Sequence, residues 1–189
     1  CSSFSPLLRI VCTPERIAQK KAEEGVPHIR VAARAYKRQL DKGKHFLHEH
    51  PKDSDSWDMD EIKELAARDD VYVVRGPMCR WKMKSPGQEG YVRKETQWMT
   101  SSLEIAMILE GQCTNYTGEE PWHRHCNLVS NQPGFGGRAR LAGAYPPQLV
   151  AAVLRAFKKQ LARDGGAHLL HSFAAGDVAD EEGLGDQVE

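Results

Sequence analysis

Apolar residues at two different spacings divide the chain into candidate helices and strands. From Ile29 to Leu40 they recur every three or four positions, as on the buried face of a helix. Thr13-Pro14-Glu15 supplies a capping hydroxyl, a proline at the first helical position and an acid in the first turn. We therefore predict a helix from this triplet toward Asp41, kinked or split at Gly25-Val26-Pro27.

Further helices and strands are predicted along the rest of the chain. Val71–Val74 is apolar throughout, which is typical of a strand buried on both faces in a parallel sheet. The C-terminal helix is expected to bury a stripe of six apolar residues: Leu149, Val150, Val153, Leu154, Phe157 and Leu161. The remaining predictions are strands over 45–48 and 91–99, and helices over 59–68, 101–109 and 145–161.

This order of helices and strands implies βαβ units with right-handed crossovers. The fold class expected is α/β: part of a doubly wound, Rossmann-like, mostly parallel sheet that lacks its N-terminal half. Such sheets place their sites at the carboxyl ends of strands, and Glu49 follows the strand over 45–48.

Composition narrows the possible partners. The 189 residues carry 26 lysines and arginines against 26 acids, so no global field draws the chain to nucleic acid or membrane. No apolar run approaches the roughly 20 residues that span a bilayer, so we expect no membrane partner. Five irregularly spaced cysteines argue for a reducing compartment, nuclear or cytoplasmic. We expect one domain over residues 1–163 and a disordered acidic tail over 164–189.

Two groups could cooperate in catalysis. Cys1 lies on a loop, and Glu49 ends a strand after one intervening helix. In an open α/β sheet this arrangement can bring a nucleophilic thiol and a proton donor to the same edge.

Several short motifs in a fixed order carry a resemblance to a known family. They are Cys1-x-x-Phe4-Ser5, Gly43–Pro51 with Ser56-Trp57, Cys79, Arg93-Lys94-x-Thr96, Met99–Ser102, His123-x-His125, Gly137-Arg138 and Tyr145-Pro146-x-x-Leu149. Over residues 1 to about 160 the chain resembles the methyltransferase-like segment of copia-type retrotransposon polyproteins, which is itself similar to the catalytic half of cytosine-5 DNA methyltransferases. The resemblance implies a longer polyprotein, with DNA as the expected partner.

The resemblance also implies roles for individual residues. Cys1 corresponds to the thiolate that adds to carbon 6 of a flipped-out cytosine, which makes carbon 5 nucleophilic toward the methyl group of S-adenosylmethionine. Glu49 corresponds to the glutamate that hydrogen-bonds the ring nitrogen and amino group of cytosine, and His50 stands where the family has asparagine. The family's glycine-rich cofactor loop precedes the cysteine and is not in this sequence. Methylation with S-adenosylmethionine is therefore expected only of the full-length parent.

A basic and aromatic segment is the candidate nucleic-acid contact. Arg93, Lys94 and Thr96 are predicted on a strand near Trp81 and Trp98, and the family's arginine-rich motif is reduced here to a segment holding Arg80. Basic residues interleaved with aromatic ones can follow a phosphate backbone and stack on bases. The alternative is a solvent-exposed edge strand, on which lysine prevents pairing with another chain.

A second cluster offers metal ligands. Cys113, His123, His125 and Cys126 carry the thiolates and imidazoles that zinc prefers. Their spacing does not match a standard zinc motif, and histidines that cap a loop or contact phosphate are the favoured interpretation.

The sequence thus supports two hypotheses. The first is a partial, degenerate cytosine-5 DNA methyltransferase-like domain that uses Cys1 and Glu49. The alternative is a non-catalytic α/β module that binds nucleic acid or acts as a scaffold.

Overall fold

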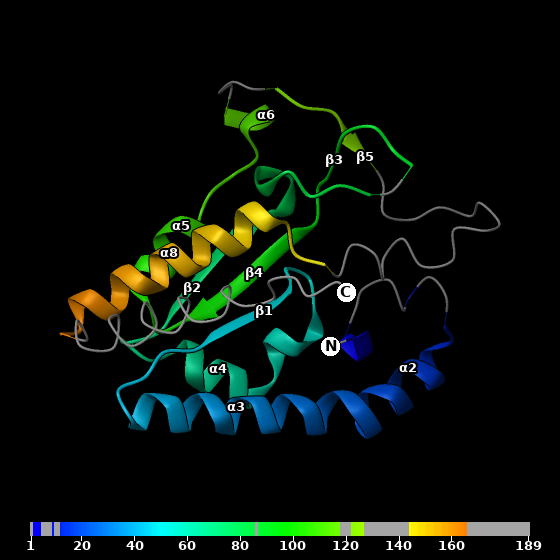
Figure 1. Cartoon of the computed structure of the whole chain (residues 1–189). Helices are drawn as coiled ribbons and strands as arrows, with labels where there is room; N and C mark the ends of the chain where they lie inside the picture. Colours follow the sequence, from blue (N-terminus) through cyan, green and yellow to red (C-terminus); the bar gives the residue numbers. More distant parts are fainter. Residues whose placement is uncertain are drawn as a thin grey trace, which may run out of the picture.

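The computed structural model describes residues 2–4, 9, 12–85, 87–117, 122–126 and 144–165. The first half contains η1 (Ser2–Phe4), α2 (Pro14–Lys20), η2 (Lys21–Gly25), α3 (Val26–Asp41), β1 (Leu47–Pro51), η3 (Asp55–Asp58), α4 (Asp60–Ala66), β2 (Tyr72–Pro77) and η4 (Met78–Trp81). The second half contains β3 (Tyr91–Val92), β4 (Glu95–Thr100), α5 (Leu103–Leu109), α6 (Thr114–Thr117), β5 (His125–Cys126) and α8 (Pro147–Arg163). Figure 1 shows their arrangement.

The main sheet has three strands in the order β1-β4-β2, and both pairings are antiparallel. Trp98 at the centre of β4 lies opposite Glu49 on one side and Val74 on the other. Because β4 returns between them, β1 and β2 run in the same direction without pairing. The mixed α/β class is confirmed, but the expectation of a mostly parallel sheet is wrong for these strands, since apolar patterning does not reveal strand direction.

Helices cover both faces of this sheet (Figure 1). Neighbouring residues of β4 point to opposite faces, so Trp98 joins one core and Met99 the other. The core on the side of α3 and α4 contains Phe4, Ile29, Ala33, Phe46, Ile62, Leu65, Val71 and Met99. The core on the side of α5 and α8 contains Met78, Met83, Val92, Trp98, Ile105, Leu109, Leu149 and Ala156.

The long N-terminal helix is interrupted where the sequence predicted. Thr13 caps α2, and the π-helical turn η2 joins α2 to α3 around Gly25 and Pro27. Proline has no amide hydrogen to donate, so the regular hydrogen-bond ladder cannot continue through it. Gly25 is also required for space, since a Cβ there would lie 2.8 Å from the Phe4 ring.

Two predictions about apolar segments need correction. β2 is an edge strand with an exposed Val73, not a strand buried on both faces, because β4 takes the central position. In α8, Leu149 is buried and Val153 packs against the core, but Val150, Leu154 and Phe157 are exposed. These exposed residues line open grooves beside β1, so the expected buried stripe is only half covered.

Some predicted features lie outside the described residues. They are the tail over 166–189, the glycine-rich loop over 134–143 and Cys1 itself. Within the described part of the chain, no helix is both long and apolar enough to cross a membrane. The segment after Gly111, for which the sequence predicted no element, contains the short α6 and β5.

Candidate functional site

Glu49 lies at the middle of β1, and its carboxylate is held from two sides. Lys94 Nζ donates to Glu49 Oε1 at 3.0 Å, and the Tyr145 hydroxyl donates to Oε2, also at 3.0 Å. Only 16% of the Glu49 side chain is exposed. Burial, followed by the nearby Glu49 charge, raises the pKa of Tyr145, so its hydroxyl stays protonated as a donor. Glu49 is therefore a positioned carboxylate, within the strand rather than at its end.

A cavity of about 430 Å³ opens beside Glu49, between α3, the edge strand β1 and α8. Its lining is polar at one end, where Glu49 meets Tyr145 and Trp98 contributes an aromatic wall. Along α8 the lining becomes apolar, through Leu149, Val150, Val153 and Leu154. The sequence predicted Glu49 but not this cavity, since no local pattern records how α3 and α8 face each other.

Two buried histidines flank Glu49 on the opposite side of β1, as strand alternation requires. His48 Nδ1 lies 3.0 Å from the Tyr36 hydroxyl, while its buried Nε2 has no hydrogen-bond partner among the described residues. His50 Nδ1 hydrogen-bonds Ser56 and lies 3.3 Å from the Ser54 hydroxyl. Burial lowers the pKa of His48 to about 4, and burial together with His48 lowers the pKa of His50 to about 3. Both imidazoles are therefore neutral near pH 7.

The structure does not give the distance between the two predicted catalytic residues, Cys1 and Glu49. Cys1 lies outside the described residues, so its distance to Glu49 is not described. The strand that carries Glu49 is extended, as predicted, and spans Leu47–Pro51.

The four predicted nucleic-acid contacts are engaged within the chain. Arg80 donates to the carbonyls of Leu109 and Glu110 at 3.4 and 2.9 Å, so it caps the C-terminus of α5. Lys94 pairs with Glu49 as described above.

Arg93 donates to Glu95 at 2.7 Å, hydrogen-bonds the Tyr116 hydroxyl and lies 4.5 Å from the centre of the Tyr116 ring. Thr96 is 1% exposed, and its hydroxyl donates to the Lys94 carbonyl. A side chain this buried cannot contact nucleic acid, so for Thr96 the prediction is wrong: it lies on the central strand of the sheet.

A compact group of metal-ligand types lies at the end of the molecule formed by β3, β5 and α6 (Figure 1). It consists of Cys79, Cys113, His123 and His125, whose ligand atoms all lie within 4.8 Å of one another. Cys113 Sγ is 3.5 Å from His123 Nε2 and 3.4 Å from His125 Nε2, and the two nitrogens are 3.1 Å apart. Burial lowers the pKa of His125, which keeps its imidazole neutral and able to bind a cation.

Each member of this group is fixed by its local structure. Cys79 lies in η4, the turn that follows β2, and Cys113 precedes α6. Asn115 holds His123 by a reciprocal pair of hydrogen bonds, donating to the His123 carbonyl at 2.6 Å and accepting from its amide at 2.9 Å. The Arg124 carbonyl accepts from the Tyr91 amide at 2.8 Å, which fixes the start of β5 against β3.

Three of these four residues belong to the group that the sequence offered as possible metal ligands, which had Cys126 in place of Cys79. Cys126 follows His125 in β5, and successive strand residues point to opposite faces. Its thiol accordingly packs against the core beneath α8. Cys79 is the fourth member of the group because η4 places it beside residues 113–125. The spacing of residues within 113–126 could not reveal this contact.

Comparisons with known proteins identify no relative. No family model, no curated protein and no solved structure matches this chain.

Proposed function

We propose that this chain is part of a cytosine-5 DNA methyltransferase-like domain of a retroelement polyprotein, in which Glu49 binds the target base and Cys1 is the nucleophile. The observation that carries the proposal is the Glu49 carboxylate, held at the polar end of an open cavity on a strand of the α/β sheet. The order of motifs along the sequence adds to it, since Glu49 occupies the position of the family's base-binding glutamate.

The polar end of the cavity suits a flipped-out pyrimidine. A carboxyl group can accept a hydrogen bond from the exocyclic amino group of cytosine and exchange a proton with the ring nitrogen. Tyr145 is partly exposed and donates to one carboxylate oxygen, so an incoming base would displace it while Lys94 keeps its contact with the other. Trp98 provides an aromatic surface beside the carboxylate.

One crossover in the sheet agrees with the resemblance, although the central strand β4 is antiparallel to both of its neighbours. β1 and β2 run in the same direction and are connected through α4, and doubly wound sheets also include antiparallel strands.

His50 departs from the family, which has an asparagine that orients the loop after the strand. It hydrogen-bonds Ser56 in η3, the turn after β1, and under this proposal the neutral imidazole would take over the role of the amide.

S-adenosylmethionine is the cofactor that the family uses as methyl donor. The residues that hold it in the family form a glycine-rich loop, which the printed sequence does not contain. Methyl transfer is accordingly proposed for the full-length parent, and base binding is proposed for the chain itself.

Base binding can be tested with the chain as it is. Two labelled DNA duplexes are titrated by fluorescence anisotropy. One carries a mispaired cytosine, and the other is the same duplex with a mispaired thymine at that position. The chain should prefer cytosine, and Glu49→Gln should reduce this preference by about 10- to 150-fold, since a hydrogen bond to a charged group contributes about 1.5–3 kcal/mol. Glu64→Gln is the matched control, because Glu64 forms an exposed ion pair with Lys37 on the far side of α3. Equal affinity for the two duplexes in the unmodified chain would refute base recognition.

The nucleophile needs a separate readout. A duplex carrying 2-pyrimidinone in place of the target base can trap an attacking thiolate without a methyl donor. Mass spectrometry should place the adduct on Cys1, and Cys12→Ser should leave its yield unchanged. An adduct on another cysteine, or none with a duplex that binds, would remove Cys1 from the proposal.

The pairing of Glu49 also favours the second candidate, a non-catalytic α/β scaffold. Both carboxylate oxygens already have partners, and Arg80 and Arg93 donate within the chain. A scaffold of this kind would bind the two duplexes equally and would not respond to Glu49→Gln, so the same titration separates the two functions.

A further inference from the structure

We propose that Cys79, Cys113, His123 and His125 bind one zinc ion. Their four ligand atoms converge from three separate segments of the chain to within 4.8 Å of one another. Two cysteines and two histidines make a ligand set of structural zinc sites. The ion would bind whether or not Glu49 accepts a base.

The distances agree with ligands around one tetrahedral ion. Zn–N bonds of about 2.05 Å and Zn–S bonds of about 2.3 Å at tetrahedral angles separate two nitrogens by about 3.3 Å and a nitrogen from a sulfur by about 3.5 Å. The observed separations are 3.1 Å between the two imidazole nitrogens, and 3.4 and 3.5 Å from those nitrogens to Cys113 Sγ. Cys113, His123 and His125 therefore already have the separations of ligands around one ion, and Cys79 lies within 4.8 Å of them, so a small shift of this side chain would complete the site.

The types of ligand atom indicate which metal ion the site would bind. Magnesium and calcium prefer oxygen ligands, whereas two thiolates and two imidazoles in a compact tetrahedral group favour zinc. In an iron–sulfur cluster with two cysteines and two histidines, the two residue types ligate different irons. Here Cys113 Sγ is as close to both imidazole nitrogens as ligands of a single ion would be.

The surroundings hold the ligands in place. Asn115 fixes the backbone of His123, as described above, and the Thr114 hydroxyl lies 3.5 Å from His123 Nδ1, the ring nitrogen that does not face the cluster. Contacts to the outer nitrogen orient a metal-bound imidazole and set its tautomer. Both cysteines are buried, which protects their thiols from competing reactions.

The ion would replace a hydrophobic core in this part of the molecule. Tyr116 and Trp122 are 62% and 69% exposed, and the β3–β5 ladder contains only two residue pairs. A segment with so little apolar burial gains stability from a metal that connects it to the rest of the fold. Cys79 follows directly on β2, so the ion would join residues 113–126 to the three-stranded sheet. Four protein ligands leave no open position, so the site is structural rather than catalytic.

Metal analysis of the purified chain tests the proposal. Protein refolded with zinc and dialysed should retain one zinc ion per chain. Replacement by cobalt should give the intense visible absorption of a tetrahedral ion with a thiolate charge-transfer band. Cys113→Ser or His123→Asn should weaken zinc affinity by more than about 100-fold, because loss of even outer contacts costs about 10–100-fold.

Cys126→Ser is the matched control. Its thiol is adjacent in sequence to His125 but packs against the core, so the variant should retain the metal and the cobalt spectrum. A cobalt spectrum lost in Cys126→Ser and kept in His123→Asn would overturn the assignment.

A measurement on the unmodified chain keeps the test valid if ligand-loss variants fail to fold. Its cobalt charge-transfer band should have the intensity of two thiolates, and added zinc should displace the cobalt at one ion per chain. A cobalt complex without a thiolate band, or no stoichiometric metal in the unmodified chain, would refute the site.

Discussion

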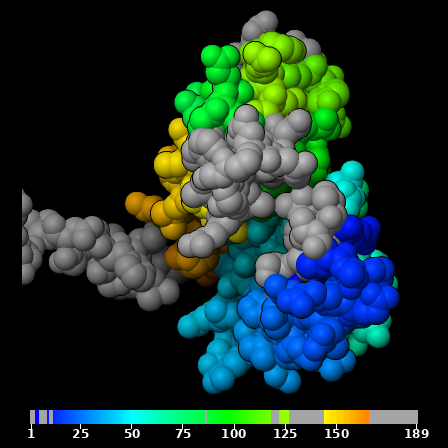
Figure 2. All heavy atoms as spheres, turned by 90° about the vertical axis from the view of Figure 1, so that its right-hand side faces the viewer, coloured from blue at the N-terminus to red at the C-terminus, as the bar shows by residue number. Residues whose placement is uncertain are grey.

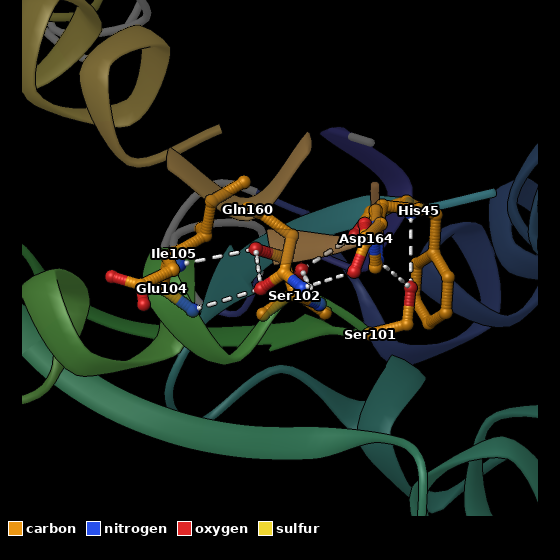
Figure 3. A network of polar contacts seen from close by, with 9 residues as sticks. His45, Ser101, Ser102, Glu104, Ile105, Gln160 and Asp164 are labelled. Carbon is orange, nitrogen blue, oxygen red and sulfur yellow. Dashed lines mark hydrogen bonds and ion pairs between the residues drawn. The ribbon is translucent and has the colours of Figure 1, made fainter. Parts of the chain in front are cut away.

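Gln160 connects the end of α8 to the start of α5, and its loss should destabilise the fold measurably (Figure 3). Its side-chain oxygen accepts from the Ser102 hydroxyl at 3.1 Å and from the Glu104 amide at 3.2 Å. Its side-chain nitrogen donates to Asp164 at 2.9 Å, and Asp164 in turn lies 2.7 Å from His45 Nε2. One buried amide thus connects α5, α8 and the segment before β1.

The free-energy cost of Gln160→Ala comes from the two buried polar groups that lose their hydrogen-bond partner. The Glu104 amide lies in the first turn of α5 and has no helical partner, and both it and the Ser102 hydroxyl are buried. A buried polar group without a partner costs about 1–3 kcal/mol. The better helix propensity of alanine returns only a few tenths of a kcal/mol. The expected loss is about 3 kcal/mol, or a Tm lower by about 6–12 °C for a chain of this size.

Denaturant and thermal unfolding followed by circular dichroism measure this change. Gln148→Ala is the matched control, since Gln148 lies in the exposed first turn of the same helix and its loss should change stability by less than about 0.5 kcal/mol. Equal stabilities of the two variants would show that the network does not hold α8 in place.

Two further perturbations test other parts of the fold. His48 has a pKa of about 4 in the folded state against about 6.5 when unfolded, so the unfolded chain takes up the proton first and stability falls as pH drops from 6.5 to 4. The variant His48→Leu should remove up to about 1.4 kcal/mol per pH unit from the slope of unfolding free energy against pH in that range, and identical slopes for wild type and His48→Leu would contradict the buried neutral imidazole. Gly111→Ala should lower the unfolding free energy by about 2–3 kcal/mol in urea titration, since its φ is +151° and the new Cβ would lie 2.5 Å from the Arg80 guanidinium that caps α5. Gly43→Ala, at φ +62° with open space around it, should cost about 1 kcal/mol, and a reversed order of the two glycine variants would contradict the packing of Arg80.

Local chemistry was enough to predict most of the helices. Thr13 with Pro14 provides a cap that depends only on neighbouring residues, and this cap forms; α5 is capped by Ser102, one residue after the start of the predicted capping box. The two N-terminal helices lie at one end of the molecule, and β3, β5 and α6 lie at the other (Figure 1 and Figure 2), a separation that no local pattern contains.

Strand order and direction in the sheet could not be predicted from local sequence patterns. Strand periodicity reports which residues are buried, and it is the same for parallel and antiparallel pairing. β4 is buried along nearly its whole length because it lies between β1 and β2, whereas the sequence suggested that β2 was the buried strand. Direction and strand order depend on the path of the connections, which pass through segments of weak pattern.

The two candidate sites differ in the same way. Glu49 could be proposed in advance because it follows a predicted strand and lies in a contiguous motif that carries the family resemblance. The cysteine–histidine group could not, since its ligands come from positions 79, 113, 123 and 125 and the first is separated from the others by β3, β4 and α5. The alternation of β5 also decides between adjacent candidates: with His125 turned toward Cys113, Cys126 must face the core. Side-chain direction and long-range convergence, rather than ligand type, are therefore what support the proposed metal site over a group of loop histidines in this chain.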